Sequence, residues 1–144
     1  MNRALIALLP LALLAACGPA EVGGRAQLDL ELPVFESNHV LTVYALAPEL
    51  KDGTALACAN VEAQQVDIDN DAEIYDQGSI SGADVAGQGQ IALTLEEIPS
   101  GADRFFVATV NDSNTGNPWG IGCTGGVTIE AGKQAAVSIQ VIQL

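Results

Sequence analysis

The sequence predicts a mainly β protein, folded as an antiparallel β-sandwich with one short helix near residues 54–66. Two observations predict this class. Several segments alternate apolar and polar residues with a period of two, which is typical of half-buried strands. Clusters of glycine, proline, asparagine and serine separate these segments at short intervals, and turns require such residues. We expect a single domain over residues 26–144.

The first part of this domain contains two strand patterns. Residues 26–32 alternate without a break, and Pro33 should end that strand because proline has no backbone N–H to donate. Residues 40–47 are rich in β-branched residues and leucine and are apolar on both faces. This second pattern predicts a central strand that ends at Pro48.

A helix is expected next, over residues 55–66. The segment is rich in alanine, lacks glycine and proline, and follows a candidate N-cap at Asp52 or Thr54. A further strand through residues 57–63 is the competing interpretation.

Residues 67–89 are first acidic and then rich in glycine and serine. This composition predicts an irregular excursion with at most a short strand near Ile74 or Ile80.

The remaining strands follow in the last third of the chain. Residues 90–95 alternate, and residues 104–110 form the strongest strand pattern in the sequence. Two short β segments, at residues 119–123 and 126–129, come next. A last strand is expected at residues 136–142, with its valine and isoleucine side chains on one face.

The order of these C-terminal segments resembles the transthyretin-like sandwich of carboxypeptidase regulatory-type domains. The resemblance rests on the turn Ile98-Pro99-Ser100-Gly101 before one strand and on Ala131-Gly132 before the last one. It covers only the last third of the chain, and it implies a structural or adhesive module without shared catalytic residues. Immunoglobulin-like and fibronectin-like sandwiches are the alternatives.

The N-terminus has the layout of an export signal. Arg3 is the only charge before an apolar run over residues 4–16, which is too short to span a bilayer, since a spanning helix needs about 20 residues. The run ends in Leu14-Ala15-Ala16-Cys17, which resembles the lipobox of bacterial lipoproteins. The resemblance implies a diacylglycerol thioether on Cys17, removal of residues 1–16 and acylation of the new amine, for example with palmitate. A plain signal peptide cut at the same place is the alternative.

A lipid on Cys17 would place the protein in the cell envelope, with residues 17–25 as the lipidated end and a short tether. Two or more acyl chains hold a small domain stably, whereas one does not. Gly18, directly after the cysteine, favours the outer membrane over the inner one. The domain would then face either the periplasm or the outside of the cell.

The chain is strongly acidic, with a formal net charge of −13 at pH 7. Such a surface repels nucleic acid and anionic lipid head groups. The charge therefore excludes nucleic acid as a partner and indicates a soluble body held off the membrane.

Lipidation of Cys17 would leave Cys58 and Cys123 as the remaining cysteines. The oxidising compartment outside the cytoplasm favours their pairing in one disulfide. Two free, buried thiols are the alternative. A zinc site has less support, because His39 is the only histidine and no Cys-x-x-Cys motif occurs.

The best candidate for ligand binding is the acidic run over residues 67–76. Its alternating carboxylates could surround a hard cation such as Ca²⁺, and the start of the run resembles an EF-hand loop. Ala72 and Gly78 stand where that loop needs glycine and a bidentate glutamate, which disfavours a true EF-hand. An irregular Ca²⁺ loop and a solvated acidic loop are the two interpretations; the candidate ligands are Asp67, Asp69, Asp71 and Glu73.

No residue pattern indicates an enzyme. His39 lies in a predicted turn, and no Gly-x-Ser-x-Gly nucleophile motif occurs. Trp119 follows a polar loop over residues 111–118. We consider two interpretations, an exposed binding loop that uses Asn117 and Trp119, and a tryptophan that covers the edge of the core.

The sequence therefore predicts a non-enzymatic, lipid-anchored envelope protein of structural or protein-interaction type. Its expected partner is another envelope protein, contacted through a sheet edge or through the loop at residues 111–119. A lipoprotein that binds Ca²⁺ or a small ligand at residues 67–76 is the alternative.

Overall fold

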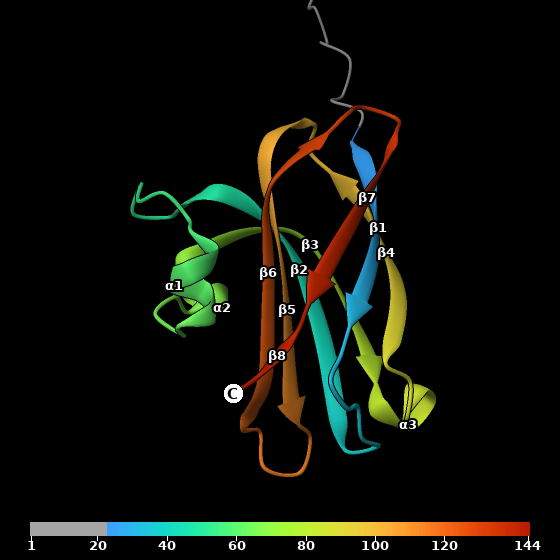
Figure 1. The fold of residues 1–144 in the computed structure, drawn as a ribbon. Coiled ribbons are helices and arrows are strands. Elements are labelled where there is room, and N and C mark those ends of the chain that lie inside the picture. Colours follow the sequence, from blue (N-terminus) through green and yellow to red (C-terminus); the bar gives the residue numbers. More distant parts are fainter. Residues whose placement is uncertain (1–22) are drawn as a thin grey trace, which may run out of the picture.

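The fold is described from a computed structural model, which defines residues 23–144. In this part of the chain two β-sheets lie face to face, and three short helices lie outside them (Figure 1). The mainly β sandwich that the sequence predicts is confirmed. In chain order the elements are β1 (Gly24–Glu31), β2 (His39–Leu50), α1 (Cys58–Glu62), α2 (Ile68–Asp71), β3 (Ala72–Ser81), α3 (Gly82–Val85), β4 (Gln90–Ile98), β5 (Gly101–Asp112), β6 (Pro118–Ile129), β7 (Gln134–Gln140) and β8 (Ile142–Gln143).

The smaller sheet has the strand order β4-β1-β7, with β1 in the centre. β1 is antiparallel to β4 but parallel to β7, so this one pair differs from the expected antiparallel pattern. The turn after β6 brings the chain back beside the start of β1, where the Arg25 N–H donates to the Lys133 carbonyl at 2.9 Å. β7 therefore leaves from the same end as β1 and runs in the same direction.

The larger sheet has the order β3-β2-β5-β6-β8 and is antiparallel throughout. β2 pairs with β5 in continuous register from His39 opposite Asp112 to Leu46 opposite Phe105. β2 and β5 are thus interior strands, as the apolar character of both their faces predicts.

The main core lies between the two sheets. Alternate residues of β1 point into it, and Ala26, Leu28 and Leu30 are at most 1 % exposed. Burial of each large apolar side chain stabilises the fold by roughly 1.5–3 kcal/mol. The one-sided apolar pattern of the last strand is confirmed, because Val137 and Ile139 are also buried in this core.

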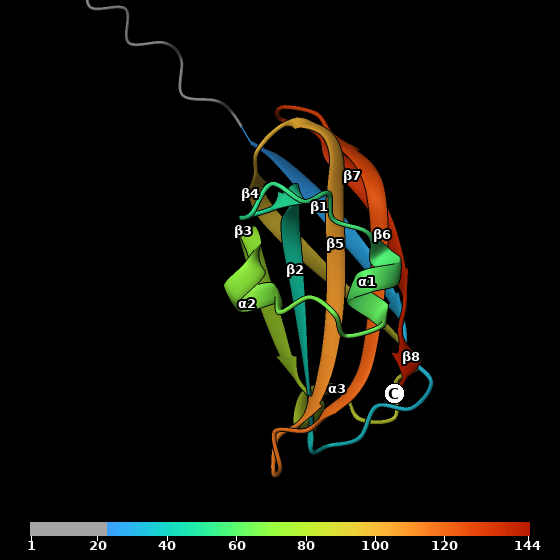
Figure 2. The ribbon, with the colours of Figure 1, turned by 90° about the vertical axis from the view of Figure 1, so that its left-hand side faces the viewer.

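A second apolar cluster, which we call the outer cluster, lies on the outer face of the larger sheet beneath α1 and α2 (Figure 2). The sheet contributes residues from β2, β3, β5 and β6, and the excursion over residues 51–71 covers them. This cover is why the larger sheet is apolar on both faces. The buried members are Leu46, Leu56, Val61, Ile68, Ala72, Val107 and Ile121.

The helix expected near residues 54–66 is present but short, since α1 covers only Cys58–Glu62. Ala57 occupies its N-cap without a side-chain hydrogen bond. Asp52 instead accepts the Thr54 N–H at 2.8 Å in the preceding turn. The tertiary contacts of Val61, which is 1 % exposed, hold a helix that is too short to be stable alone.

The excursion predicted as irregular over residues 67–89 is more regular than expected. It contains the ten-residue strand β3 as well as α2 and α3. β3 lies at the edge of its sheet, and most of its residues are half-buried or exposed. An edge strand needs no long apolar alternation, so its sequence signal is weak.

Several strand ends also differ from the prediction. β2 continues through Pro48, which lies in a stretch that pairs with neither neighbouring strand, so its missing N–H costs no ladder hydrogen bond. The segments expected at residues 119–123 and 126–129 form one strand, β6, whose register with β5 shifts in the middle. The last strand ends at Gln140, and Val141 separates it from β8.

The passage of the chain from β7 to β8 closes one side of the sandwich. β8 pairs with β6 at Gly120 and Ile121, so the chain moves from the smaller sheet to the larger one. A Cβ atom on Gly122 would lie 2.4 Å from the Gln140 carbonyl oxygen. Only glycine allows this close approach of the two backbones.

Candidate functional site

The lipidation candidate Cys17 and the signal peptide over residues 1–16 lie outside the described residues. The described chain begins at Gly23, whose carbonyl accepts the Gly132 N–H at 3.2 Å. This contact places Gly23 at the end of the sandwich that holds the β6–β7 turn (Figure 1), which we call the tether end. None of the helices within residues 23–144 has the length and apolar character needed to cross a bilayer.

The predicted disulfide between Cys58 and Cys123 is confirmed. It joins the start of α1 to the middle of β6, with 5.3 Å between the two Cα atoms. The bond closes a loop with a sequence separation of 65 residues and fixes the cover of the outer cluster to the sheet.

The structure gives the acidic run at residues 67–76 a local role. Asp67 is the N-cap of α2, where its carboxylate accepts the Asn70 N–H at 3.3 Å and the Asn70 side-chain amide at 2.7 Å. The Asp71 carboxylate accepts the Asp67 N–H at 3.0 Å. The hydrogen bonds from Asn70, first that of its side chain and then that of its backbone N–H, lower the pKa of Asp67 below its ordinary value, and the charge of Lys51 adds to this effect.

The four candidate calcium ligands are not gathered around one point. Asp67, Asp69 and Asp71 lie on the short helix or its cap, whereas Glu73 lies on β3. Over residues 23–144, no group of three or more histidine, cysteine, aspartate or glutamate side chains is placed to hold a metal ion. Ca²⁺ binding at this run therefore stays a prediction from the sequence.

His39 is the first residue of β2 and is only 3 % exposed. Its ring Nδ1 accepts the Glu36 backbone N–H at 3.1 Å, and the backbone N–H of His39 donates to the Glu36 carbonyl at 3.0 Å. The ring centroid is 4.4 Å from that of Trp119 and 5.6 Å from that of Phe35. With Nδ1 occupied and the ring enclosed by aromatic groups, His39 contributes to the packing of the turn before β2.

Trp119 packs against the main core as well as against His39. This position matches the interpretation of a tryptophan that covers the edge of the core. Asn117 lies two residues away in the β5–β6 loop and is exposed. Trp119 is half-buried, and a binding loop that uses Asn117 and Trp119 stays a prediction from the sequence.

The β5–β6 loop is ordered by Asp112. One of its carboxylate oxygens accepts the N–H groups of Asn114 at 2.7 Å and Thr115 at 3.1 Å, and the other accepts the Asn38 side-chain amide at 2.8 Å. These bonds, first that from Asn114, lower the pKa of Asp112. The loop is thus tied to the turn before β2, at the end of the sandwich opposite the tether end (Figure 1).

The sheet edges that the sequence suggested for partner binding are partly blocked. β3 and β4 are edge strands of the two sheets and lie on the same side of the sandwich. The Asp76 carboxylate accepts the N–H of Gln77 at 2.8 Å and the N–H of Glu96 at 2.8 Å. The charged side chain of Asp76 thus lies between the two edge strands β3 and β4. A charge at this position disfavours the pairing of another strand with either edge.

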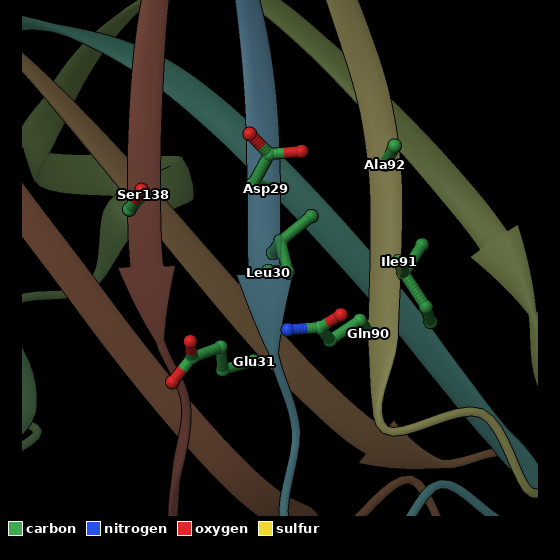
Figure 3. Close-up of a pocket in the computed structure, with 7 residues that line it drawn as sticks. All are labelled: Asp29, Leu30, Glu31, Gln90, Ile91, Ala92 and Ser138. Atoms are coloured by element: carbon green, nitrogen blue, oxygen red, sulfur yellow. The ribbon is translucent and has the colours of Figure 1, made fainter.

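The outer face of the smaller sheet has a hollow of about 400 Å³. Figure 3 shows the carboxylates of Asp29 and Glu31 on β1, the amide of Gln90 on β4 and the hydroxyl of Ser138 on β7 around it. Leu30 and Ile91 line its floor but are almost fully buried. The residues that line this hollow include two acids but no exposed large apolar side chain.

The outer face of the larger sheet has a groove of about 550 Å³, which we call the sheet groove. It lies below the outer cluster, where Figure 2 shows β2, β5 and β6 without a helix in front of them. Tyr44, Thr109 and Asn111 are among the residues of its floor. The α1–α2 loop, the β5–β6 loop and the C-terminal Leu144 surround this floor.

Tyr44 is the titratable group at the floor of the sheet groove. Burial, and after it the nearby Asp69 carboxylate, raise the pKa of the Tyr44 phenol, while a hydrogen bond with Thr109 acts in the opposite direction. The field of Asp69 therefore reaches the floor of the groove. Sequence reasoning missed Tyr44 and Thr109, because they are distant in sequence. Only the pairing of β2 with β5, with Tyr44 opposite Val107 and Thr42 opposite Thr109, brings them diagonally together on one face of the sheet.

Comparison with known proteins shows one likeness of fold. No protein-family model matches the sequence, and no curated protein sequence matches it. The structure is similar to that of an alternative pilotin from the type II secretion system of Vibrio cholerae, with a TM-score of 0.51. The match covers 85 % of this chain and 96 % of that chain at 13 % sequence identity. At this identity the likeness concerns the fold alone.

Proposed function

We propose that this protein is a non-enzymatic lipoprotein of the bacterial cell envelope, anchored by acyl chains on Cys17, and that it acts by binding another envelope protein. The observation that carries the proposal is the pattern Leu14-Ala15-Ala16-Cys17 at the end of a short apolar run. We assign the anchor to the outer membrane, because Gly18 rather than aspartate follows the cysteine.

The start of the folded domain supports this arrangement. Residues 18–23 separate Cys17 from β1, and six extended residues span at most about 20 Å. The tether end would therefore lie close to the bilayer. The β5–β6 loop and α3, at the opposite end, would be the parts most distant from the membrane (Figure 1).

An interaction role has two further supports. The chain shares its fold with an alternative pilotin from a type II secretion system. In addition, His39, the single histidine of the sequence, is enclosed by aromatic side chains and serves packing. A domain with these properties is better suited to binding than to acid–base catalysis.

The anchor is tested by expressing the full chain and a Cys17→Ser variant in a bacterium with two membranes. We expect the wild type to float with outer-membrane vesicles and to have the intact mass of residues 17–144 plus a diacylglycerol and an amide-linked acyl chain. The variant should lack both the added mass and the flotation. A wild-type mass without lipid would contradict the proposal.

The partner is tested by crosslinking in living cells that contain the lipidated protein. We expect one specific envelope protein to be recovered with the wild type, and a smaller amount with the Cys17→Ser variant, because the anchor raises the local concentration. Recovery of the same background proteins with both forms would contradict an interaction role.

A further inference from the structure

We propose that the sheet groove is the docking site for the partner, and that it binds a protein segment that presents a lysine or arginine between apolar residues. The inference rests on the proposed function and adds to it the place and the chemistry of the contact. Its steps are the shape of the groove, its charge, and the apolar groups at its rim.

The shape suits a side chain together with its neighbours. A volume of about 550 Å³ lies within the range of roughly 300–1,000 Å³ that is usual for ligand sites. The groove is floored by rigid strands and walled by the α1–α2 loop, which the Cys58–Cys123 disulfide and the Asp67 cap hold in place. Little ordering would be needed on binding, which favours affinity.

The charge of the groove favours a cation. Asp67 and Asp69 lie in one wall, and no lysine, arginine or histidine is among the residues that line the groove. Lys51 lies close enough to Asp67 to help lower the pKa of that carboxyl, and its ammonium donates to the carbonyl oxygens of Asn70 at 2.9 Å and Asp69 at 3.4 Å. The Asp67 carboxylate is largely engaged with Asn70, so Asp69 is the carboxylate free to pair with a ligand.

The aromatic ring on the floor and the apolar groups at the rim of the groove can contact a long basic side chain. The half-buried ring of Tyr44 is an aromatic partner for an ammonium or guanidinium group. Val66 lines the groove and is half-buried, and Leu144, which also lines it, is 46 % exposed. These apolar groups can cover the methylene stem of lysine or arginine and a flanking apolar residue, as such amphipathic side chains require.

The two acidic faces of the sandwich differ in the aromatic and apolar groups that they offer to a basic side chain. The hollow of the smaller sheet also holds two acids, Asp29 and Glu31, but it offers neither an aromatic ring nor an exposed apolar rim. Charge alone would therefore attract a basic segment equally to both faces. Only the sheet groove combines charge with a place for the stem, and this difference supplies matched controls.

The first test is a selection of random nine-residue peptides displayed on phage against the purified domain. We expect the enriched peptides to share one lysine or arginine flanked by apolar residues. They should lose binding to a Thr109→Arg variant, which fills the groove, and keep it with Thr94→Arg, which adds the same charge to the exposed face of β4. Enrichment of peptides without a basic position, equal binding to both variants, or no enrichment would overturn the proposal.

The second test measures the charge contribution with the best selected peptide by NMR titration. Asp67→Asn with Asp69→Asn should weaken binding about fivefold or more, because it removes the carboxylates while asparagine keeps the α2 cap. Asp29→Asn with Glu31→Gln removes the same charge from the other face and should change affinity less than twofold. Equal weakening by both pairs, or equal affinity for free lysine amide, would overturn docking of a protein segment.

The outcome can be separated from that of the proposed function. A photo-crosslinking residue at Asn111 in the groove and one at Ala92 on the other face should differ in cells, with the partner captured from Asn111. Capture of the same partner from Ala92 only would refute the groove and leave the envelope function standing. Loss of the lipid signal at Cys17 would refute the function without altering peptide binding to the groove.

Discussion

The main core and the outer cluster are both apolar, but they are built differently. The main core is enclosed by two sheets whose strands supply alternate residues from their own patterns. The outer cluster is enclosed by one sheet and by the excursion over residues 51–71, which has only short helices. A crosslink joins that excursion to β6, whereas the two sheets are joined by packing and by the chain connections.

This comparison shows how the molecule makes one of its two outer faces different from the other. Each sheet has one face toward the main core and one face that points away from it. The smaller sheet keeps polar residues there, while the larger sheet is covered over one half and leaves the sheet groove over the other half. The cover therefore creates the groove, and its attachment should matter for binding as well as for stability.

The largest effect is expected from the main core. Leu30→Ala should lower the free energy of unfolding by about 3–5 kcal/mol, because Leu30 is 1 % exposed between two sheets that cannot collapse around the cavity. Urea denaturation followed by the fluorescence of Trp119, the single tryptophan, measures this loss. A loss below about 1 kcal/mol would mean that the two sheets are not tightly packed at this position.

The disulfide is expected to contribute somewhat less. Replacing both Cys58 and Cys123 by serine should cost up to about 4 kcal/mol in the chain-entropy model for a loop of this length. Amide hydrogen exchange should also show that α1 opens before the two sheets separate, since α1 is the element that the bond attaches. Unchanged stability together with unchanged protection of α1 would contradict the role assigned to the bond.

Leu56→Ala is the matched change in the outer cluster. Leu56 is buried at 5 % exposure, but it belongs to the excursion itself, which can settle onto the sheet and fill the space that is left. We expect a loss of about 2 kcal/mol, at the lower end for this kind of substitution. A loss equal to that of Leu30→Ala in the same urea experiment would mean that the outer cluster is as rigid as the main core.

The smallest effect concerns pH and the cap of the cover. The pKa of Asp67 is lowered in the folded state by its hydrogen bonds to Asn70, so its ionised form contributes stability above the unfolded pKa. That contribution should be lost as the pH falls through the lower folded pKa. Asp67→Asn keeps the cap but removes the titration, and it should reduce the loss of stability between neutral and acid pH.

The control for this prediction is the free energy of unfolding of the wild type, measured at the same neutral and acid pH values. Asp52 and Asp112 also have lowered pKa values, caused first by hydrogen bonds from Thr54 and Asn114, so the variant should retain part of the acid sensitivity. A variant with the full wild-type sensitivity would show that Asp67 is not bonded as described.

Local sequence patterns were sufficient to assign the strands that have one or two buried faces. Residues 26–32 and 104–110 could be assigned because a buried strand must supply an apolar residue at every second position or at every position. β3 could not be assigned in the same way. It pairs with β2 only, and its mostly half-exposed residues carry no periodic signal.

The chemistry of the candidate sites divides in a similar manner. Cysteine count and compartment were enough to predict the Cys58–Cys123 pair, since two partners allow one pairing. The acidic run suggested metal ligands because the sequence shows where carboxylates occur in the chain but not where their side chains point. The structure shows that Asp67 and Asp71 point back to their own helix, where the nearest unpaired N–H groups are.

The sequence by itself determined the sandwich class, the interior strands, the disulfide and the expectation of a lipid anchor. Each of these follows from residues that are close together or from residue types that are few in number. Only the tertiary structure decided the parallel pairing of β1 with β7, the cover of one outer face and the sheet groove that this cover leaves. These features join segments distant in sequence, because backbone pairing and side-chain burial select among registers that local patterns leave equally favourable.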